Sequence, residues 1–303
     1  MANVIELVPT QTPGSVQLRA TWSPSSVNLF LQCSLKYWFE KVARWQSQPS
    51  EALVSGNIVH GVLEDLLSKP SGERTRDVAR ESYMLYQERN MQGLEDVIDL
   101  RAVRERSGQA IESYFALENP NDVAIAPDGI ERSISGQVAD VPLEGRIDRL
   151  EQSEAGLRIV DYKTGNPKPA YMESNWRQQM LYAAASDQAI DDGEVAEVAL
   201  FYLGEEPRLL VRPVTKFATT SVSDALRRVD DAREEFHAES RWQAKTGPLC
   251  RHCAFKIVCP AKSKRAPTPG SSDSEARLEE SSEVYKRKSL PTEASDSTSE
   301  EKE

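Results

Sequence analysis

The sequence contains no run of eighteen consecutive apolar residues, and its N-terminal stretch, MANVIELVPTQTPG, has no basic segment followed by an apolar one. The first absence argues against a transmembrane helix, and the second argues against a secretory signal peptide. We therefore expect a cytoplasmic protein with no membrane partner. With 303 residues, of which 39% are hydrophobic, the chain can bury the core of one large domain or two small ones.

Basic residues are outnumbered, because 37 Lys and Arg stand against 48 Asp and Glu and give a net charge of −11. A chain of this charge does not coat polyanions with its whole surface, so charge alone counts against nucleic-acid binding. A local groove can still contact phosphate groups, and an acidic metal site adds negative charge that bound cations offset. Net charge therefore leaves a nucleic-acid partner open.

Cysteine is scarce, with four residues in the whole chain: Cys33, Cys250, Cys253 and Cys259. In a reducing cytoplasm such a set more often holds a metal or a cluster than two disulfides. The last three form a C-x2-C-x5-C-P run, which together with a distant fourth thiolate suits a Cys₄ site for zinc or for an iron–sulfur cluster. Spacing alone leaves both open. The site would staple the C-terminal segment onto the first helix and would be largely structural, and His252 is not needed as a ligand.

The most informative stretch is a predicted β-hairpin with strands at residues 143–150 and 157–163, joined by a polar turn. A turn centred on residues 154–155 places Asp148 opposite Asp161, and Lys163 shares a face with Asp161 while Tyr162 points away. Two such carboxylates raise each other's pKa unless a cation lies between them, and oxygen ligands suit Mg²⁺ or Mn²⁺. The alternative is a solvated strand edge with an ordinary ion pair, and spacing alone does not decide between the two.

The remaining periodicities predict an αβ chain. Ser23-Pro24-Ser25 indicates a helix start, and the apolar pattern that follows places Cys33 on that helix. We further predict helices at 56–67, 74–90, 94–117, 171–189 and 220–242, and strands at 130–138, 195–203 and 208–214. Residues 1–20 read as a lead-in with an edge strand around 4–8, residues 21–260 as one domain with a helical insertion at about 73–118, and residues 261–303 as a disordered tail.

Three side chains on the predicted helices have alternative interpretations. His60 flanks the apolar stripe of the 56–67 helix, where a histidine is usually structural. Gln178 and Tyr182 are four residues apart and share a helix face, an ordinary pair by itself. Trp176 and Arg177 beside them could stack on a base or contact a phosphate, or have no such role.

The pattern Gly145-Arg-Ile-Asp148, a gap, and Val160-Asp161-Tyr162-Lys163-Thr164-Gly165 resembles the core motif of the PD-(D/E)XK nuclease superfamily, in its RecB-like branch. Aspartate stands at Asp161, where some relatives have glutamate. The resemblance implies a mixed α/β (α+β) restriction-endonuclease-like core, with a central mixed sheet flanked by helices. It implies catalytic roles for Asp148, Asp161 and Lys163. It also implies that His60, in a Gly-x-x-x-His pattern, binds the metal together with Asp148, Asp161 and the Tyr162 carbonyl.

Two further patterns extend the resemblance. Gln178 and Tyr182 are similar to a Gln-x-x-x-Tyr motif that helps position DNA. One cysteine before the core and three after it resembles the iron–sulfur RecB-like exonucleases, including the CRISPR-associated and AddB-type ones, which favours [4Fe–4S] over zinc. Ser34 departs from the proline common after the first cysteine.

The activity implied is that of an Mg²⁺- or Mn²⁺-dependent deoxyribonuclease, a hydrolase of phosphodiester bonds. We expect an exonuclease on single-stranded DNA or free ends, acting in DNA repair, recombination, or CRISPR-type or phage DNA processing, with protein partners left open. The alternatives are a non-catalytic DNA-binding or scaffold protein with a structural Cys₄ site, and a zinc-stapled regulatory module without a nucleic-acid role. The intact set of Asp148, Asp161, Lys163 and His60 argues against the first alternative.

Overall fold

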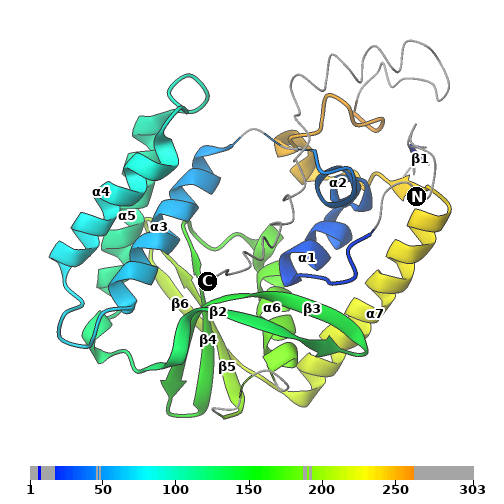
Figure 1. Ribbon diagram of the computed structural model, residues 1–303. Helices are drawn as coiled ribbons and strands as arrows, with labels where there is room; N and C mark the ends of the chain where they lie inside the picture. The colour runs from blue at the N-terminus through cyan, green and yellow to red at the C-terminus, as the bar shows by residue number, and fades with distance from the viewer. Residues whose placement is uncertain are drawn as a thin grey trace, which may run out of the picture.

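The computed structural model describes residues 6–7, 18–45, 47, 49–186, 190 and 193–262. Its centre is a five-stranded sheet with the order β2-β3-β4-β5-β6 (Figure 1). Only β4 and β5 are parallel, and α6 connects them, so the sheet is mixed as predicted. The elements are β1 Glu6–Leu7, α1 Pro24–Gln32, α2 Ser34–Tyr37, π-helix η1 Trp38–Val42, α3 Glu51–Leu67, α4 Arg76–Met91, α5 Leu100–Leu117, η2 Pro120–Asp122, β2 Ile125–Val138, β3 Val141–Ser153, β4 Gly156–Lys163, α6 Pro169–Ser186, β5 Val195–Tyr202, β6 Arg208–Pro213, α7 Lys216–Ala238, β7 Trp242–Gln243 and η3 Pro248–His252.

The predicted hairpin is confirmed as β3 and β4. Arg149 faces Val160 across the ladder, and the strands are joined at Glu154 and Ala155 as expected. Both strands are longer than predicted at their turn ends, because Ser153 and Gly156 still pair. The ladder between them ends at the pair Arg149 and Val160, directly before Asp148 and Asp161.

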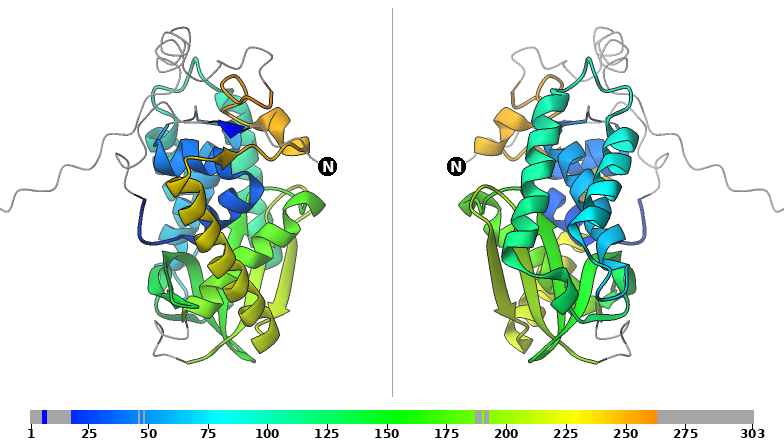
Figure 2. Two further views of the ribbon diagram at one scale, coloured as in Figure 1. Left: turned by 90° about the vertical axis from the view of Figure 1, so that its right-hand side faces the viewer. Right: turned by 90° about the vertical axis from the view of Figure 1, so that its left-hand side faces the viewer.

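Helices cover both faces of the sheet and enclose two apolar cores. On one face α3, α4 and α5 pack over Val160, Tyr162 and Phe201. On the other face α1, α6 and α7 pack over Ile159 and Leu200. Figure 2 shows α4 and α5 on one side of the molecule and α7 on the opposite side. The predicted fold class is therefore confirmed, and α4 and α5 lie in the stretch predicted as a helical insertion.

The predicted first helix is interrupted, which corrects one expectation. Ser23 caps α1 by accepting a hydrogen bond from the Ser26 N–H at 3.2 Å, as predicted, but Cys33 is extended, with φ −168°, and does not lie on a helix. Ser34 explains the break, because its hydroxyl donates to the Gln243 carbonyl and accepts from the Gln243 N–H, both at 3.0 Å. The chain turns at Cys33 to make these bonds with β7.

An aromatic cluster joins the two ends of the domain. Trp22 lies 5.2 Å from Tyr37 between ring centroids, and Tyr37 stacks on Trp242 at 6.0 Å. Phe30 stacks on Phe236 of α7 at 5.8 Å. The segments before and after the sheet are thus held together by apolar packing, independently of the cysteines.

Within the described ranges, no helix combines the length and apolar character needed to cross a bilayer. Of the expected N-terminal edge strand, the described part is Glu6–Leu7, which pairs with β7. The predicted tail lies outside the described residues from position 263 onward.

Candidate active site

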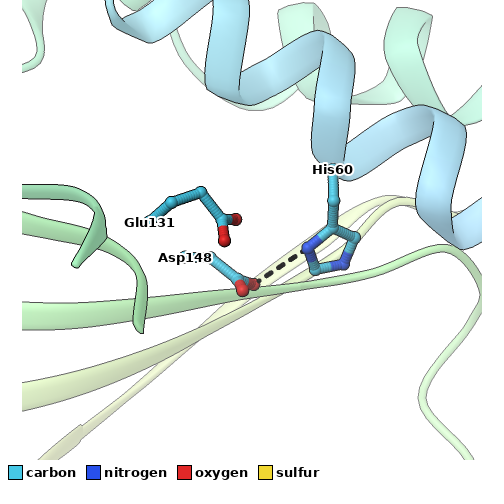
Figure 3. A group of neighbouring side chains, drawn as sticks. All are labelled: His60, Glu131 and Asp148. Carbon is cyan, nitrogen blue, oxygen red and sulfur yellow. Dashed lines mark ion pairs between the residues drawn. The ribbon is translucent and has the colours of Figure 1, made fainter. Parts of the chain in front are cut away.

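His60 reaches toward the sheet from α3. The neighbouring Val59 and Val62 are fully buried, whereas 32% of the His60 side chain is exposed. Helix α3 approaches α4 closely because Gly61 has no side chain, and a Cβ there would lie 2.2 Å from Cε1 of Tyr86. This packing fixes the helix from which the imidazole extends (Figure 3).

Asp148 occupies the point where β3 and β4 separate. Beyond the last ladder pair, the Tyr162 N–H donates a hydrogen bond to Asp148 Oδ2 at 3.0 Å. The same oxygen lies 3.4 Å from Nδ1 of His60, and Nε2 of His60 lies 3.1 Å from the Tyr162 carbonyl oxygen. His60 therefore bridges the Asp148 carboxylate and the backbone oxygen of Tyr162.

Glu131 on β2 brings a second carboxylate to His60. Its backbone is left-handed, with φ 48°, and it follows a register shift in the pairing of β2 with β3. A bulge of this kind redirects a side chain, and Figure 3 shows the Glu131 carboxylate turned toward Asp148 and His60. One ligand atom from each of the three residues lies within 4.8 Å of the others. We call these residues the His60 group.

The sequence pattern did not predict Glu131 as part of the site. The available signal was Pro127-Asp128-Gly129 inside a stretch that otherwise reads as a strand, because proline and glycine in a strand mark bulges. Gly129 is required there, since a Cβ would lie 2.4 Å from the carbonyl oxygen of Leu150.

Asp161 and Lys163 form an ion pair beside the His60 group. Nζ of Lys163 lies 2.6 Å from Asp161 Oδ2, and Nε2 of Gln178 donates to Asp161 Oδ1 at 3.3 Å. Asp161 is 6% exposed. The structure thus brings the predicted ligands His60 and Asp148 together, whereas the Asp161 carboxylate faces Lys163 and Gln178.

The charges of the site are strongly coupled. Burial alone would lower the pKa of His60, but Asp148 raises that pKa to about 9. Burial would raise the pKa of Asp148, yet the adjacent His60 holds it below its usual value. Burial raises the pKa of Asp161 despite Lys163, and burial together with the Asp148 charge raises that of Glu131. A cation bound among these carboxylates would relieve their mutual repulsion.

The donor set fits a divalent ion. Carboxylate oxygens, a backbone carbonyl and one imidazole are ligands that Mg²⁺ or Mn²⁺ accept. Glu131, Asp148 and His60 already converge, and the Tyr162 carbonyl oxygen lies beside the imidazole.

The Tyr162 ring lies on the sheet face opposite to the Asp161 and Lys163 side chains, as strand alternation predicts, and it meets the His60 ring edge-on at 6.0 Å between ring centroids. It packs edge-on against Phe201, and the fully buried guanidinium of Arg149 lies 5.6 Å from the ring centroid. Arg149 is bidentate to Glu118 and also pairs with Glu151 at 2.9 Å. This network holds the β4 backbone whose carbonyl faces His60, and losing one partner of a buried ion pair costs about 3–5 kcal/mol.

Tyr182 fits beside the site because position 145 is a glycine. A Cβ on Gly145 would lie 2.7 Å from Cε1 of Tyr182 and 2.9 Å from its hydroxyl oxygen. Burial raises the pKa of Tyr182 to about 12, so the phenol is protonated at neutral pH. The two predicted positioning residues therefore lie close to β3 and β4, Tyr182 against Gly145 and Gln178 on Asp161.

The stability of the metal-free protein should decrease as pH rises from about 6.5 to about 9. The folded protein binds the His60 proton more tightly than the unfolded chain does, because its pKa of about 9 exceeds the ordinary 6.5. This stabilisation is complete below pH 6.5 and is lost as the pH rises through about 9, the pKa of His60 in the folded protein. Melting temperatures in EDTA across this range should show the decrease, His60→Gln should flatten it, and the exposed His252→Gln should not. A wild-type curve parallel to that of His60→Gln would contradict the prediction.

The four cysteines line one cleft of about 930 Å³, although they come from opposite ends of the domain. Burial raises the pKa of the Cys253 and Cys259 thiols, and the nearby sulfurs of Cys33 and Cys250 raise it further. The Gly247 N–H points at the Cys250 sulfur at 3.3 Å. Four thiols that line one cleft fit a soft metal site, either zinc or an iron–sulfur cluster.

The idea that Trp176 stacks on a base is wrong. Its ring is 4% exposed, and the guanidinium of Arg212 lies 4.4 Å from the ring centroid. Arg177 remains partly exposed and donates to Asn28 at 2.9 Å.

Known proteins share a sequence profile and a fold with this chain. Residues 21–260 match the sequence profile of the PD-(D/E)XK nuclease superfamily. A crystal structure of a provisionally assigned exonuclease from Eubacterium rectale superposes with a TM-score of 0.51 at 13% identity, over 85% of this chain and 92% of that one. The crystal structure of SSO0001 matches with a TM-score of 0.35 at 10% identity, over 72% of this chain and 89% of that one. No curated protein matches. The chain belongs to the PD-(D/E)XK nuclease superfamily, and it shares its fold with the Eubacterium rectale protein.

Proposed function

We propose that this protein is a divalent-metal-dependent DNA nuclease that hydrolyses phosphodiester bonds at the site formed by the His60 group and the Asp161–Lys163 pair. The observation that carries the proposal is the convergence of His60, Glu131 and Asp148 within 4.8 Å, beside a buried carboxylate held by a lysine. A structural ion pair alone would not need two acidic side chains facing one histidine.

Mg²⁺ or Mn²⁺ would be held by His60, Glu131, Asp148 and the Tyr162 carbonyl, with Asp161 as a further ligand. When bound, the ion lowers the pKa of water and offsets the negative charge of the scissile phosphate. The Asp148 carboxylate stays ionised, because His60 and the Tyr162 N–H both stabilise its charge.

Lys163 and its neighbours position the reacting groups. Asp161 raises the pKa of Lys163 and overcomes the effect of burial, so the side chain remains an ammonium ion. Such a fixed cation can orient the attacking water and stabilise the charge that develops on the phosphate. Gln178 orients Asp161 through its amide, and Tyr182 offers a neutral hydroxyl next to Gly145.

Exonuclease action on single-stranded DNA is part of the proposal. Superfamily membership supports a nuclease, and the shared fold with the Eubacterium rectale protein is consistent with exonuclease activity.

The Cys₄ site would hold a [4Fe–4S] cluster, with zinc as the alternative. One cysteine before the core and three after it, the arrangement that resembles the iron–sulfur RecB-like exonucleases, supports the cluster.

Incubation of the purified protein with Mn²⁺ and end-labelled single-stranded DNA should release nucleotides or short fragments. Asp161→Ala and Lys163→Ala should each reduce the rate about 10²–10³-fold, because each removes a charge at the reacting phosphate. Lys69→Ala, an exposed lysine after α3, is the matched control. Activity of the two site variants equal to that of the control would eliminate the assigned site.

Gly145→Ala should reduce DNA cleavage about tenfold in a protein that still folds, because the added methyl group would displace the Tyr182 ring. Gly165→Ala is the matched control, since a Cβ at Gly165 has no neighbour within 4 Å. Circular dichroism checks the fold, and single-turnover cleavage gives the rate. Wild-type rates for Gly145→Ala would show that Tyr182 does not act in the site.

A further inference from the structure

A second feature of the molecule is the cleft that contains the cysteines. It extends from Gln178 and Tyr171 on α6, along α1 and α2, to the segment of Cys250 and Cys259. Gln178 is shared by the cleft and the proposed active site, because its side chain donates to Asp161. The cleft therefore begins at Gln178, beside the Asp161–Lys163 pair, and ends at the cysteines.

Charge is distributed unevenly in this cleft. Its lining includes six basic side chains: Lys36, Lys41, Arg177, Lys245, Lys256 and Lys262. Two acidic side chains, Glu40 and Glu173, line it as well. The cleft is thus basic in a chain whose net charge is −11. Such segregation concentrates an attractive potential for polyanions in one groove.

Several of these basic groups remain available to a ligand. Lys41, Lys256 and Lys262 have no carboxylate partner among the residues that the structure describes. Lys36 makes a loose pair with Glu40 at 3.6 Å, and Lys245 donates to a backbone carbonyl. A surface lysine without a partner does not by itself indicate a site, but here the lysines share one concave wall with the active-site glutamine.

An exposed aromatic ring accompanies the positive charge. Tyr171, in the first turn of α6, lines the cleft and is 39% exposed. A basic groove with an aromatic surface is the arrangement that binds single strands, because unpaired bases can stack on the ring while lysines follow the phosphates. Paired bases in a duplex cannot stack in this way.

We propose that this cleft binds the single strand of DNA that continues from the cut site. The bound strand would run from Asp161 past Tyr171 to the cysteine segment, and we call this path the track. The inference rests on the proposed nuclease function. It adds a path for the DNA strand, the lysines that contact its phosphates, and a dependence of affinity on the length of the strand. Short oligonucleotides would occupy only the Gln178 end, and longer ones would also contact Lys256.

The test uses the full-length protein with Lys41→Glu and Lys256→Glu combined, and fluorescence anisotropy with labelled DNA in EDTA. Affinity for a single strand of about 20 nucleotides should fall at least tenfold, and the slope of log affinity against log salt should decrease by about 1.4. Affinity for an oligonucleotide of about 6 nucleotides should change by less than about twofold. Lys69→Glu combined with Lys216→Glu makes the same change of charge at exposed positions outside the cleft.

Three results would overturn the track: unchanged affinity, an equal loss in the control pair, or an equal loss of affinity for duplex. Displacement of the DNA by an equimolar acidic peptide would instead indicate a protein partner and would also overturn it. Strand binding that depends on the lysines without cleavage in Mn²⁺ would defeat the nuclease proposal and leave the track. Cleavage by the wild type, together with wild-type DNA affinity of the Lys41→Glu and Lys256→Glu double variant, would overturn the track and leave the nuclease proposal.

Discussion

Replacement of Asp148 by asparagine is expected to reduce DNA cleavage by about 10³-fold or more. Asparagine keeps the shape of the side chain and removes its charge. Asp148 lies 3.4 Å from His60 and accepts the Tyr162 N–H, so the charge holds three parts of the site together. Its loss should also weaken the binding of Mn²⁺, because one of the converging ligands becomes neutral. Single-turnover cleavage of end-labelled DNA and titration calorimetry with Mn²⁺ measure the two effects.

Asp140→Asn provides the matched control. Asp140 is exposed in the turn between β2 and β3, and its left-handed φ of 66° is a conformation that asparagine tolerates well. The control should cleave and bind Mn²⁺ like the wild type. Wild-type cleavage by Asp148→Asn would remove the basis for the proposed mechanism.

Replacement of Cys253 by serine is expected to abolish the bound cluster and to lower the melting temperature by about 10 °C. The site would join Cys33 to the segment of Cys250 and Cys259, which are separated by most of the chain. Closing a loop of this length stabilises a fold by about 3–5 kcal/mol. The aromatic cluster still joins the two ends, so the variant should remain folded at low temperature.

His252→Ala is the control for this prediction, because His252 is exposed within the same segment. Anaerobic purification should give a brown wild-type protein containing iron, a brown His252→Ala and a colourless Cys253→Ser. A colourless wild-type protein with one zinc per chain would show that the site binds zinc and not a cluster. The structural role of the site would then stand. An unchanged melting temperature in Cys253→Ser would contradict the structural role.

The sequence predicted the hairpin because two independent signals agreed on it. Branched apolar residues defined the strands, and the polar turn defined their register, which is the observed one and puts Asp148 and Asp161 directly beyond the last ladder pair, Arg149 and Val160. The helix with His60 was also predicted, because its buried stripe is regular. The distance between His60 and Asp148 was not predictable from periodicity, because α3 and β3 come together only when the helices pack on the sheet.

Local irregularities account for what the sequence did not predict. Glu131 joins the site through a bulge that reverses the alternation of β2, so a strict two-residue period gives the wrong direction for its side chain. Cys33 interrupts the first helix because Ser34 bonds to Gln243, a residue more than two hundred positions away. Trp176 is covered by Arg212 from the edge strand β6. Each of these depends on a long-range contact that propensity does not contain.

The central claim is that the His60 group binds a divalent ion. A crystal soaked in MnCl₂ and measured at the manganese absorption edge tests it most directly. We predict an anomalous peak bounded by the His60 imidazole, the carboxylates of Glu131 and Asp148, and the Tyr162 carbonyl oxygen, about 2–2.5 Å from each ligand atom. A peak confined to surface carboxylates, with none beside His60 and Asp148, would contradict the account.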